Sequence, residues 1–235
     1  MDQPTGAEGR EPLSRSRVVA AALELIDAEG LETFSMRALA RQLQVKPNAL
    51  YWHVPDLDSL LALVAARLLD EVDLPDADLP WPERLRVSGR SYRAVVAAHP
   101  RCAALLTGRL TSNWSAAFPL VEAVLAAVRS AGVPDARVLD AYNGVVGALA
   151  GFVGVEFATA PASTAQWEES RRNDLRALDG DRFPAMAAVA DHLDGALLTR
   201  WEPAPGRPLT TSFEWLLDVL VAGVGALAAP PGTAG

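Results

Sequence analysis

A pair of prolines confines the chain to one very short helix between residues 47 and 54. Pro47 suits the first position of a helix, where the N–H that proline lacks would be unpaired in any case. Pro55 disfavours helical backbone at the residue before it, so the helix extends no further than about His53. A helix of barely two turns exposes most of its surface and has to be held in place by its neighbours.

An amphipathic helix directly precedes the short one. Ser35 is a favourable N-cap, and the apolar residues that follow it recur at helical spacing, namely Met36, Leu39, Ala40 and Leu43. Only three residues then remain before Pro47, which is the length of a tight turn. The two segments therefore predict a helix-turn-helix, with a small core of Leu39, Leu43, Val45 and Leu50.

Helical periodicity continues along the chain, and no segment alternates apolar and polar residues over the length of a strand. We therefore predict an all-α fold. The other expected helices cover residues 14–29, 56–72, 82–98, 115–131, 134–160, 184–199 and 210–228, with a short helical turn near 101–106. The polar segment 161–182 is expected to be mainly loop, with one or two helical turns.

This pattern divides the chain into two domains. We predict a three-helix helix-turn-helix domain at 14–55, a connecting helix at 56–73, a larger helical domain at 74–229, and disordered tails at 1–13 and 230–235. The chain has 235 residues, 50% of them hydrophobic, which is enough for a sizeable core.

Cysteine usage and hydropathy predict a soluble cytoplasmic protein without a membrane partner. A single cysteine, Cys102, excludes an internal disulfide and fits a reducing compartment. The polar, Pro- and Gly-containing start does not resemble a signal peptide. The longest apolar runs, at 145–155 and 219–229, are shorter than the ~18–20 residues of a membrane span.

Charge is distributed unevenly between the two domains. The whole chain carries a net charge of −8, which is unusual for a protein that binds nucleic acid. Residues 14–54 nevertheless carry +1, so the remainder carries −9. Lys46, the only lysine of the chain, stands next to Pro47 at the start of the short helix.

The residues around the short helix suit a DNA duplex. Asn48 and Ala49 are short enough to let the helix approach base edges, and Arg37 can reach a guanine edge or a phosphate. Hydroxyl, indole and imidazole groups can donate to phosphate oxygens, although Trp52 fits a packing role equally well. The residues predicted to contact DNA are Arg37, Lys46, Asn48, Ala49, Tyr51, Trp52 and His53.

Residues 14–72 resemble the DNA-binding domain of the TetR family of bacterial repressors. The resemblance rests on the pattern of the first helix, the spacing to Ser35-Met36-Arg37, and the sequence LYWHV at 50–54. It implies an all-α homodimer that binds a near-palindromic operator and is released by a small molecule. It also implies base contacts for Arg37, Asn48, Ala49 and Tyr51, and phosphate contacts for Trp52 and His53.

Two residues depart from the family pattern in the first domain. Gln44 stands where the family usually has a glycine, so left-handed backbone there would cost ~1 kcal/mol or more. Leu57 replaces a lysine that binds phosphate. Both changes favour a different operator or a weaker backbone contact.

The resemblance extends more weakly over residues 81–156 and implies a ligand pocket in the larger domain. Leu106, Arg109 and Leu110 occupy the positions of the residues that hold drug and magnesium, so we expect neither a metal nor a cofactor. The remaining residues predict an apolar or amphipathic ligand of drug size. The predicted lining residues are Tyr92, Leu106, Trp114, Val124 and Glu156, with core packing an equal alternative for Leu106 and Trp114.

Glycines mark one face of the helix expected at 134–160. Gly144, Gly147, Gly151 and Gly154 share this face, and each costs a helix roughly 0.5–1 kcal/mol relative to alanine. Close approach of another helix would offset that cost. Together with Gly223 of the last helix, these residues are the predicted dimer interface, with packing inside one chain as the alternative.

Two other functions compete with a ligand-responsive transcriptional repressor. An enzyme lacks support, since the sequence has no Gly-rich phosphate loop, no nucleophile elbow and no metal-ligand spacing. A small-molecule carrier without a DNA role would give the first 55 residues no purpose. The predicted partners are therefore double-stranded operator DNA, a second copy of the chain and a small-molecule effector.

Overall fold

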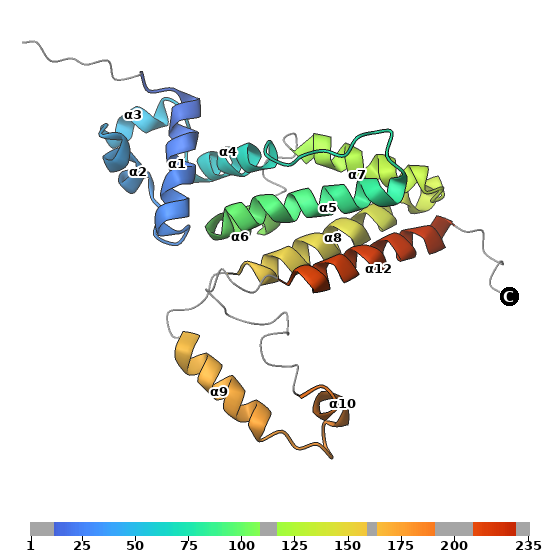
Figure 1. Ribbon diagram of the computed structural model, residues 1–235. Coiled ribbons are helices and arrows are strands. Elements are labelled where there is room, and N and C mark those ends of the chain that lie inside the picture. The colour runs from blue at the N-terminus through green and yellow to red at the C-terminus, as the bar shows by residue number, and fades with distance from the viewer. Residues whose placement is uncertain (1–11, 109–116, 159–163, 191–208, 229–235) are drawn as a thin grey trace, which may run out of the picture.

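The computed structural model describes residues 12–108, 117–158, 164–190 and 209–228, and within these ranges every regular element is a helix (Figure 1). The all-α prediction is confirmed. Residues 1–11 and 229–235, which include most of both predicted tails, lie outside the described ranges.

Three helices form the N-terminal domain: α1 (Arg15–Glu29), α2 (Met36–Leu43) and α3 (Pro47–Tyr51). Serine side chains cap the first two, because Ser14 Oγ accepts from the N–H of Arg17 and Ser35 Oγ from that of Ala38. The helix-turn-helix is therefore present as predicted. Its third helix ends at Tyr51, two residues earlier than expected, and residues 52–53 form a turn.

The turn between α2 and α3 has left-handed backbone at Gln44, with φ 54° and ψ 43°. This is the conformation for which the family usually supplies glycine, and among the described residues Gln44 is the one non-glycine residue with positive φ. The tight turn places fully buried Leu39 and Leu50 in one core, with Leu43 beside them.

Helix α4 (Leu57–Leu69) connects the two domains and packs on α1 on one side and on α5 and α6 on the other. Its N-terminus is fixed by Asp56, whose Oδ1 accepts from the N–H of Ser59 at 2.7 Å. Leu60, Val64 and Leu68 lie on one face and are fully buried, so α4 belongs to the core of both domains.

The larger domain is a bundle of helices that Figure 1 shows running side by side. Its elements are α5 (Trp81–Ala98), η1 (Pro100–Cys102), α6 (Ala103–Gly108), α7 (Phe118–Ser130), η3 (Asp135–Arg137), α8 (Val138–Glu156) and α12 (Thr210–Ala228). Helix α5 is central, since it packs on α7, α8 and α12.

The segment between α8 and α12 differs from the prediction. The expected loop at 161–182 contains a thirteen-residue helix, α9 (Thr164–Arg176), and the helix expected at 184–199 begins as α10 (Pro184–Ala187). Residues 191–199 lie outside the described ranges. The loop was inferred from polar composition, but Gln, Glu and Arg are good helix formers, and their propensity accounts for α9. Figure 1 shows α9 and α10 apart from the bundle.

Candidate functional site

The exposed face of α3 and the residues next to it form the first candidate site. Leu50 is fully buried, whereas Tyr51 and Trp52 expose 50% and 88% of their surface. Lys46, Asn48 and Arg37 are exposed, and Ala49 and His53 are half-buried. An indole that is almost entirely exposed gains nothing from the fold of this chain, so the packing alternative for Trp52 is wrong for this isolated chain.

Backbone contacts hold this face in position. The N–H of Ala49 donates to the carbonyl of Lys46 at 2.9 Å, and that of Val54 to Leu50 at 3.0 Å. From α1, Nε of Arg15 donates to the carbonyl of His53 at 3.0 Å. The sequence did not indicate that Arg15 helps to hold this face, because nothing in its local pattern points to a contact 38 residues away.

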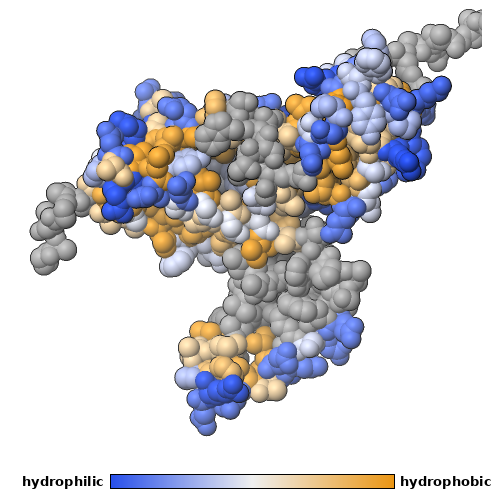
Figure 2. All heavy atoms as spheres, turned by 180° about the vertical axis from the view of Figure 1, so that it is seen from behind, coloured by the Kyte–Doolittle hydropathy of each residue, from blue (hydrophilic) through white to orange (hydrophobic). Residues whose placement is uncertain are grey.

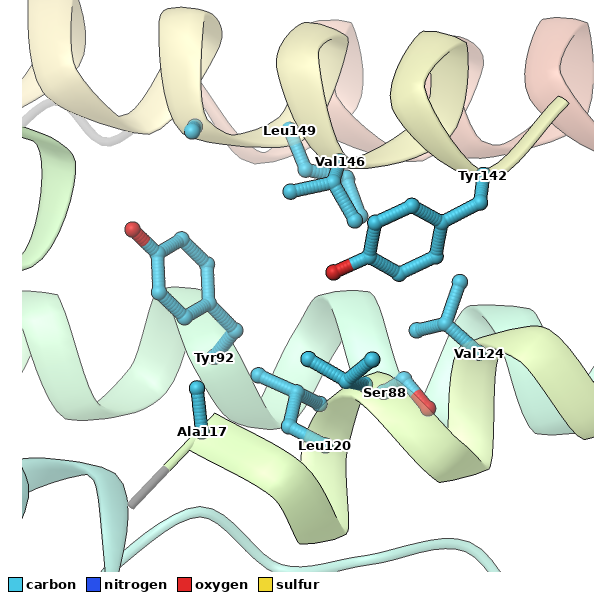
Figure 3. Close-up of a pocket in the computed structure, with 10 residues that line it drawn as sticks. Ser88, Tyr92, Ala117, Leu120, Val124, Tyr142, Val146 and Leu149 are labelled. Atoms are coloured by element: carbon cyan, nitrogen blue, oxygen red, sulfur yellow. The ribbon is translucent and has the colours of Figure 1, made fainter. Parts of the chain in front are cut away.

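A cavity of about 160 Å³ between α5, α7 and α8 is the second candidate site (Figure 3). Of the predicted lining residues, Tyr92 and Val124 line it, Leu106 and Glu156 do not, and Trp114 lies outside the described residues. The described residues that line it are Ser88, Tyr92, Ala117, Leu120, Val121, Val124, Tyr142, Val146, Leu149 and Ala150. Tyr142, Val146 and Leu149 were not among the predicted lining residues. Their helical spacing, which places them along one side of α8, was the sequence signal that could have indicated them.

The few polar groups of the cavity are hydroxyls. Tyr92 donates to the carbonyl of Leu106 at 3.5 Å, and burial raises the pKa of Tyr92 to about 12. Burial also raises the pKa of Tyr142. The hydroxyl of Ser88 is buried and has no hydrogen-bond partner among the described residues. Among the described residues no charged side chain lines the cavity, so this part of the lining suits a neutral molecule that can hydrogen-bond to Ser88.

Two family models match the chain and together cover both domains. Residues 18–64 match "Bacterial regulatory proteins, tetR family", and residues 74–227 match "Tetracyclin repressor-like, C-terminal domain". The chain belongs to the TetR family. It is a DNA-binding transcriptional regulator and not an enzyme.

Relatives of this TetR-family chain include an HTH-type transcriptional regulator from Saccharopolyspora erythraea, 32% identical over 217 residues, covering 92% of this chain and 86% of the relative. ActR from Streptomyces coelicolor in complex with actinorhodin superimposes with a TM-score of 0.75 at 26% identity, over 94% of this chain and all of ActR. BioQ with its natural double-stranded DNA operator gives 0.65 at 29% identity, over 92% and 99% of the two chains.

Glu156 of this TetR-family regulator binds within its own chain and not to the cavity. Arg93 donates to both of its carboxylate oxygens, from Nε at 2.8 Å and Nη2 at 2.6 Å. The N–H of Leu209 donates to the same carboxylate at 2.8 Å, and the guanidinium lies 4.9 Å from the ring centre of Phe213. This buried pair joins α5, the end of α8 and the start of α12.

The predicted interface glycines separate into two groups. Nothing lies within 4 Å of a Cβ added at Gly144, Gly147, Gly151 or Gly223, so these residues face open space. At Gly154 a Cβ would lie 3.0 Å from Thr107, so this glycine admits α6 of the same chain. The alternative of packing inside one chain thus describes Gly154.

Large apolar side chains are also exposed on the two helices that carry the open glycines. Leu139 and Trp215 expose 65% and 68% of their surface, and Val219 and Leu227 are also exposed. Figure 2 shows apolar residues spread over the helical bundle, with hydrophilic residues gathered on the outer side of the N-terminal domain. We call this exposed surface of α8 and α12 the smooth face. It includes Leu139, Gly144, Gly147, Gly151, Trp215, Val219, Gly223 and Leu227.

Proposed function

We propose that the protein is a cytoplasmic repressor that binds a near-palindromic operator as a homodimer and is released by a small, largely apolar molecule. The exposed cluster of Tyr51 and Trp52 directly beside buried Leu50 carries the proposal. An aromatic pair held on the outside of a short, well-anchored helix has no role in the fold, and the flanking cations attract phosphate.

The roles of the α3 residues follow from their reach. Asn48 and Ala49 lie in the first turn and are short, so they suit base edges in the major groove. Lys46 stands at the helix N-terminus, where its charge adds to the free N–H groups of the first turn. Tyr51, Trp52 and His53 follow at the other end, where a backbone phosphate can accept from their polar atoms. The BioQ complex with operator DNA supports this assignment.

The smooth face supports a homodimer. Soluble proteins rarely expose a contiguous apolar surface of this kind, and Gly144, Gly147 and Gly151 permit close approach of a second helix. Residues 135–156 and 210–228 are long and apolar enough to cross a membrane, with only 28% and 17% of the most apolar window buried. Contact with a second copy of the chain accounts for the same surface without a membrane. Binding of such a dimer to a palindromic operator requires its two α3 helices to lie ~34–36 Å apart, one turn of DNA.

The cavity defines the class of effector. A volume of about 160 Å³ accommodates a group the size of a benzene ring, and the apolar lining that the described residues provide disfavours a charged one. The structure of ActR in complex with actinorhodin supports binding of a small molecule at this fold. We assign to Ser88 a hydrogen bond with the polar substituent of the effector.

Arg37→Ala tests the DNA function. An operator is first selected from random duplex DNA with the purified protein, and affinity is measured by fluorescence anisotropy. The variant should lose ~1–3 kcal/mol of binding to the selected duplex if Arg37 contacts a guanine. Arg41→Ala, a change to an exposed arginine one turn further along α2, is the matched control and should lose much less. Failure of the wild type to select any sequence would favour the carrier alternative.

Filling the cavity tests the effector site. Val146→Phe should abolish the rise in melting temperature that neutral aromatic compounds give to the wild type, because the new ring occupies the space. Val155→Phe changes an exposed valine of the same helix and should retain the rise. Equal responses of the two variants would place the effector elsewhere.

A further inference from the structure

A cluster of charged and polar side chains joins the two domains at the end of α5. His99 follows the last residue of α5, and its Nδ1 lies 2.7 Å from Oδ2 of Asp27 in α1. Its Nε2 lies 3.3 Å from Oε2 of Glu71, two residues beyond α4. One imidazole therefore bridges the DNA-binding domain, the connecting helix and the helix that lines the cavity.

The neighbours of this bridge fix its two carboxylates. Arg101 donates to the carbonyls of Asp27 and Ala28 at the end of α1, and Cys102 donates to Oδ1 of Asp27 at 3.6 Å. Arg67 holds the other oxygen of Glu71 at 3.0 Å. Burial, together with the charge of Asp27, raises the pKa of Cys102 to about 12, so the thiol keeps its proton and remains a donor.

The number of hydrogen bonds that the bridge can make depends on the protonation state of the ring. A carboxylate only accepts hydrogen bonds, and a neutral imidazole carries a single N–H. Both ring nitrogens of His99 face carboxylate oxygens, so both contacts are hydrogen bonds only when the ring is an imidazolium. Histidine is the side chain that ordinarily changes charge between about pH 5 and 8.

The bridge is connected to the cavity through α5 and α6. Tyr92, which lines the cavity, precedes His99 by seven residues, or two turns on the same side of α5. The hydroxyl of Tyr92 also contacts the carbonyl of Leu106 in α6, and α6 packs on α4. Movement of α5 or α6 around an effector thus reaches α1 and α4 through this joint.

We propose that His99 is a positioning residue whose imidazolium ties α1 and α4 to the end of α5, so that operator affinity depends on proton occupancy of this ring. The inference rests on the proposed function, since it concerns how the DNA-binding domain is held. Loss of the proton leaves one N–H, which stays with Asp27 at the shorter distance and releases Glu71. Arg101 keeps its hold on α1, while the end of α4 loses its contact with His99 and is held less tightly.

A looser DNA-binding domain should bind a fixed operator less tightly, because ordering it costs entropy on binding. The test is the dissociation constant for the selected duplex at pH 6 and pH 8. The wild type should weaken about three- to fivefold more over this interval than His99→Gln, as expected for loss of one partly exposed ion pair. All measurements are repeated in a His53→Gln background, because His53 belongs to the proposed DNA-contacting face and is a second histidine whose charge could alter binding.

A second variant separates positioning from folding. Glu71→Gln leaves the histidine in place and removes the charge that it bridges, so it should flatten the pH profile in the same way. Asp70→Asn removes the neighbouring exposed carboxylate, for which the structure gives no contact with His99, and should keep the wild-type profile.

Hydrogen exchange of the free protein provides a readout without DNA. Amides at the end of α4 should lose protection between pH 6 and pH 8 in the wild type, after correction for intrinsic rates, and not in His99→Gln. Profiles of His99→Gln that superimpose on the wild type, or wild-type affinity that strengthens with pH, would overturn the inference while leaving the repressor function intact. Absence of any selected operator would overturn the function, and hydrogen exchange would then decide on the bridge alone.

Discussion

The candidate sites of the two domains lie in opposite environments. On α3, the candidate site lies on the outside, with fully buried Leu50 next to half-exposed Tyr51 and largely exposed Trp52. In the larger domain it lies inside, where Val124, Val146 and Leu149 line a cavity with the same residue types that fill the core around it.

This difference determines how well each candidate site can be predicted from the sequence. A DNA duplex has fixed charge and groove dimensions, so the surface that binds it needs polar and aromatic residues where the fold alone would not place them. An apolar effector needs only a gap in packing. A gap is a property of several helices together and leaves no distinctive residue pattern in any one of them.

Glu156→Ala should produce the largest effect and tests the ligand domain. The sequence suggested a ligand contact, whereas the structure shows a buried pair with Arg93 whose side chains are 3% and 14% exposed. Removing one partner of such a pair should lower the free energy of unfolding by about 3–5 kcal/mol. Urea denaturation followed by far-ultraviolet circular dichroism measures the loss.

Glu214→Ala is the matched control for this change. It breaks the ion pair with Arg90 at 2.6 Å between α5 and α12, whose side chains are 39% and 48% exposed. Such an exposed pair contributes about 0–1 kcal/mol. Equal losses in the two variants would show that burial does not distinguish these pairs. An unchanged stability of Glu156→Ala would return Glu156 to the ligand site.

Local chemistry made the N-terminal domain predictable. Ser35 and Asp56 are helix caps in the structure as expected from their residue types, and Pro47 begins α3. The left-handed conformation at Gln44 corresponds to the glycine that the family resemblance places at this position of the turn. Each of these features depends on residues within one turn of each other, which is the range over which sequence patterns are informative.

Contacts between distant residues were beyond prediction. Arg93 and Glu156 are 63 residues apart, and His99 and Asp27 are 72 apart. A charge in the sequence indicates neither its burial nor its partner. Helix α9 shows a different limit. Its residues have high helical propensity, but the prediction gave more weight to their polar composition and therefore expected a loop.

Gln44→Gly should produce a smaller effect and tests the turn of the DNA-binding domain. Glycine adopts the left-handed conformation without the steric cost of a side chain, so the variant should gain about 0.5–1 kcal/mol of unfolding free energy. Gln42→Gly, an exposed change inside α2, should lose about the same amount. A loss in both variants would mean that side-chain contacts of Gln44 outweigh the backbone cost.

The smallest expected effect concerns α4, which belongs to both regions. The N–H of Ser59 donates to Asp56, and this hydrogen bond lowers the pKa of the carboxyl below its usual value of 3.8. A lowered pKa means that the carboxylate stabilises the fold above the unfolded value, and that this contribution disappears as pH falls through the folded value. Asp56→Asn should therefore be less stable than the wild type at pH 7, with the difference shrinking as pH falls below 3.8 towards the lowered folded pKa of Asp56.

Asp70→Asn is the control at the opposite end of the same helix. A carboxylate at a helix C-terminus opposes the helix dipole, so this variant should be at least as stable as the wild type at pH 7. Urea midpoints between pH 3 and pH 7 measure both variants. If Asp56→Asn followed the wild type at every pH, the charge of Asp56 would contribute nothing to the start of α4. The helix that links DNA and effector sites would then be held by packing and by the His99 bridge.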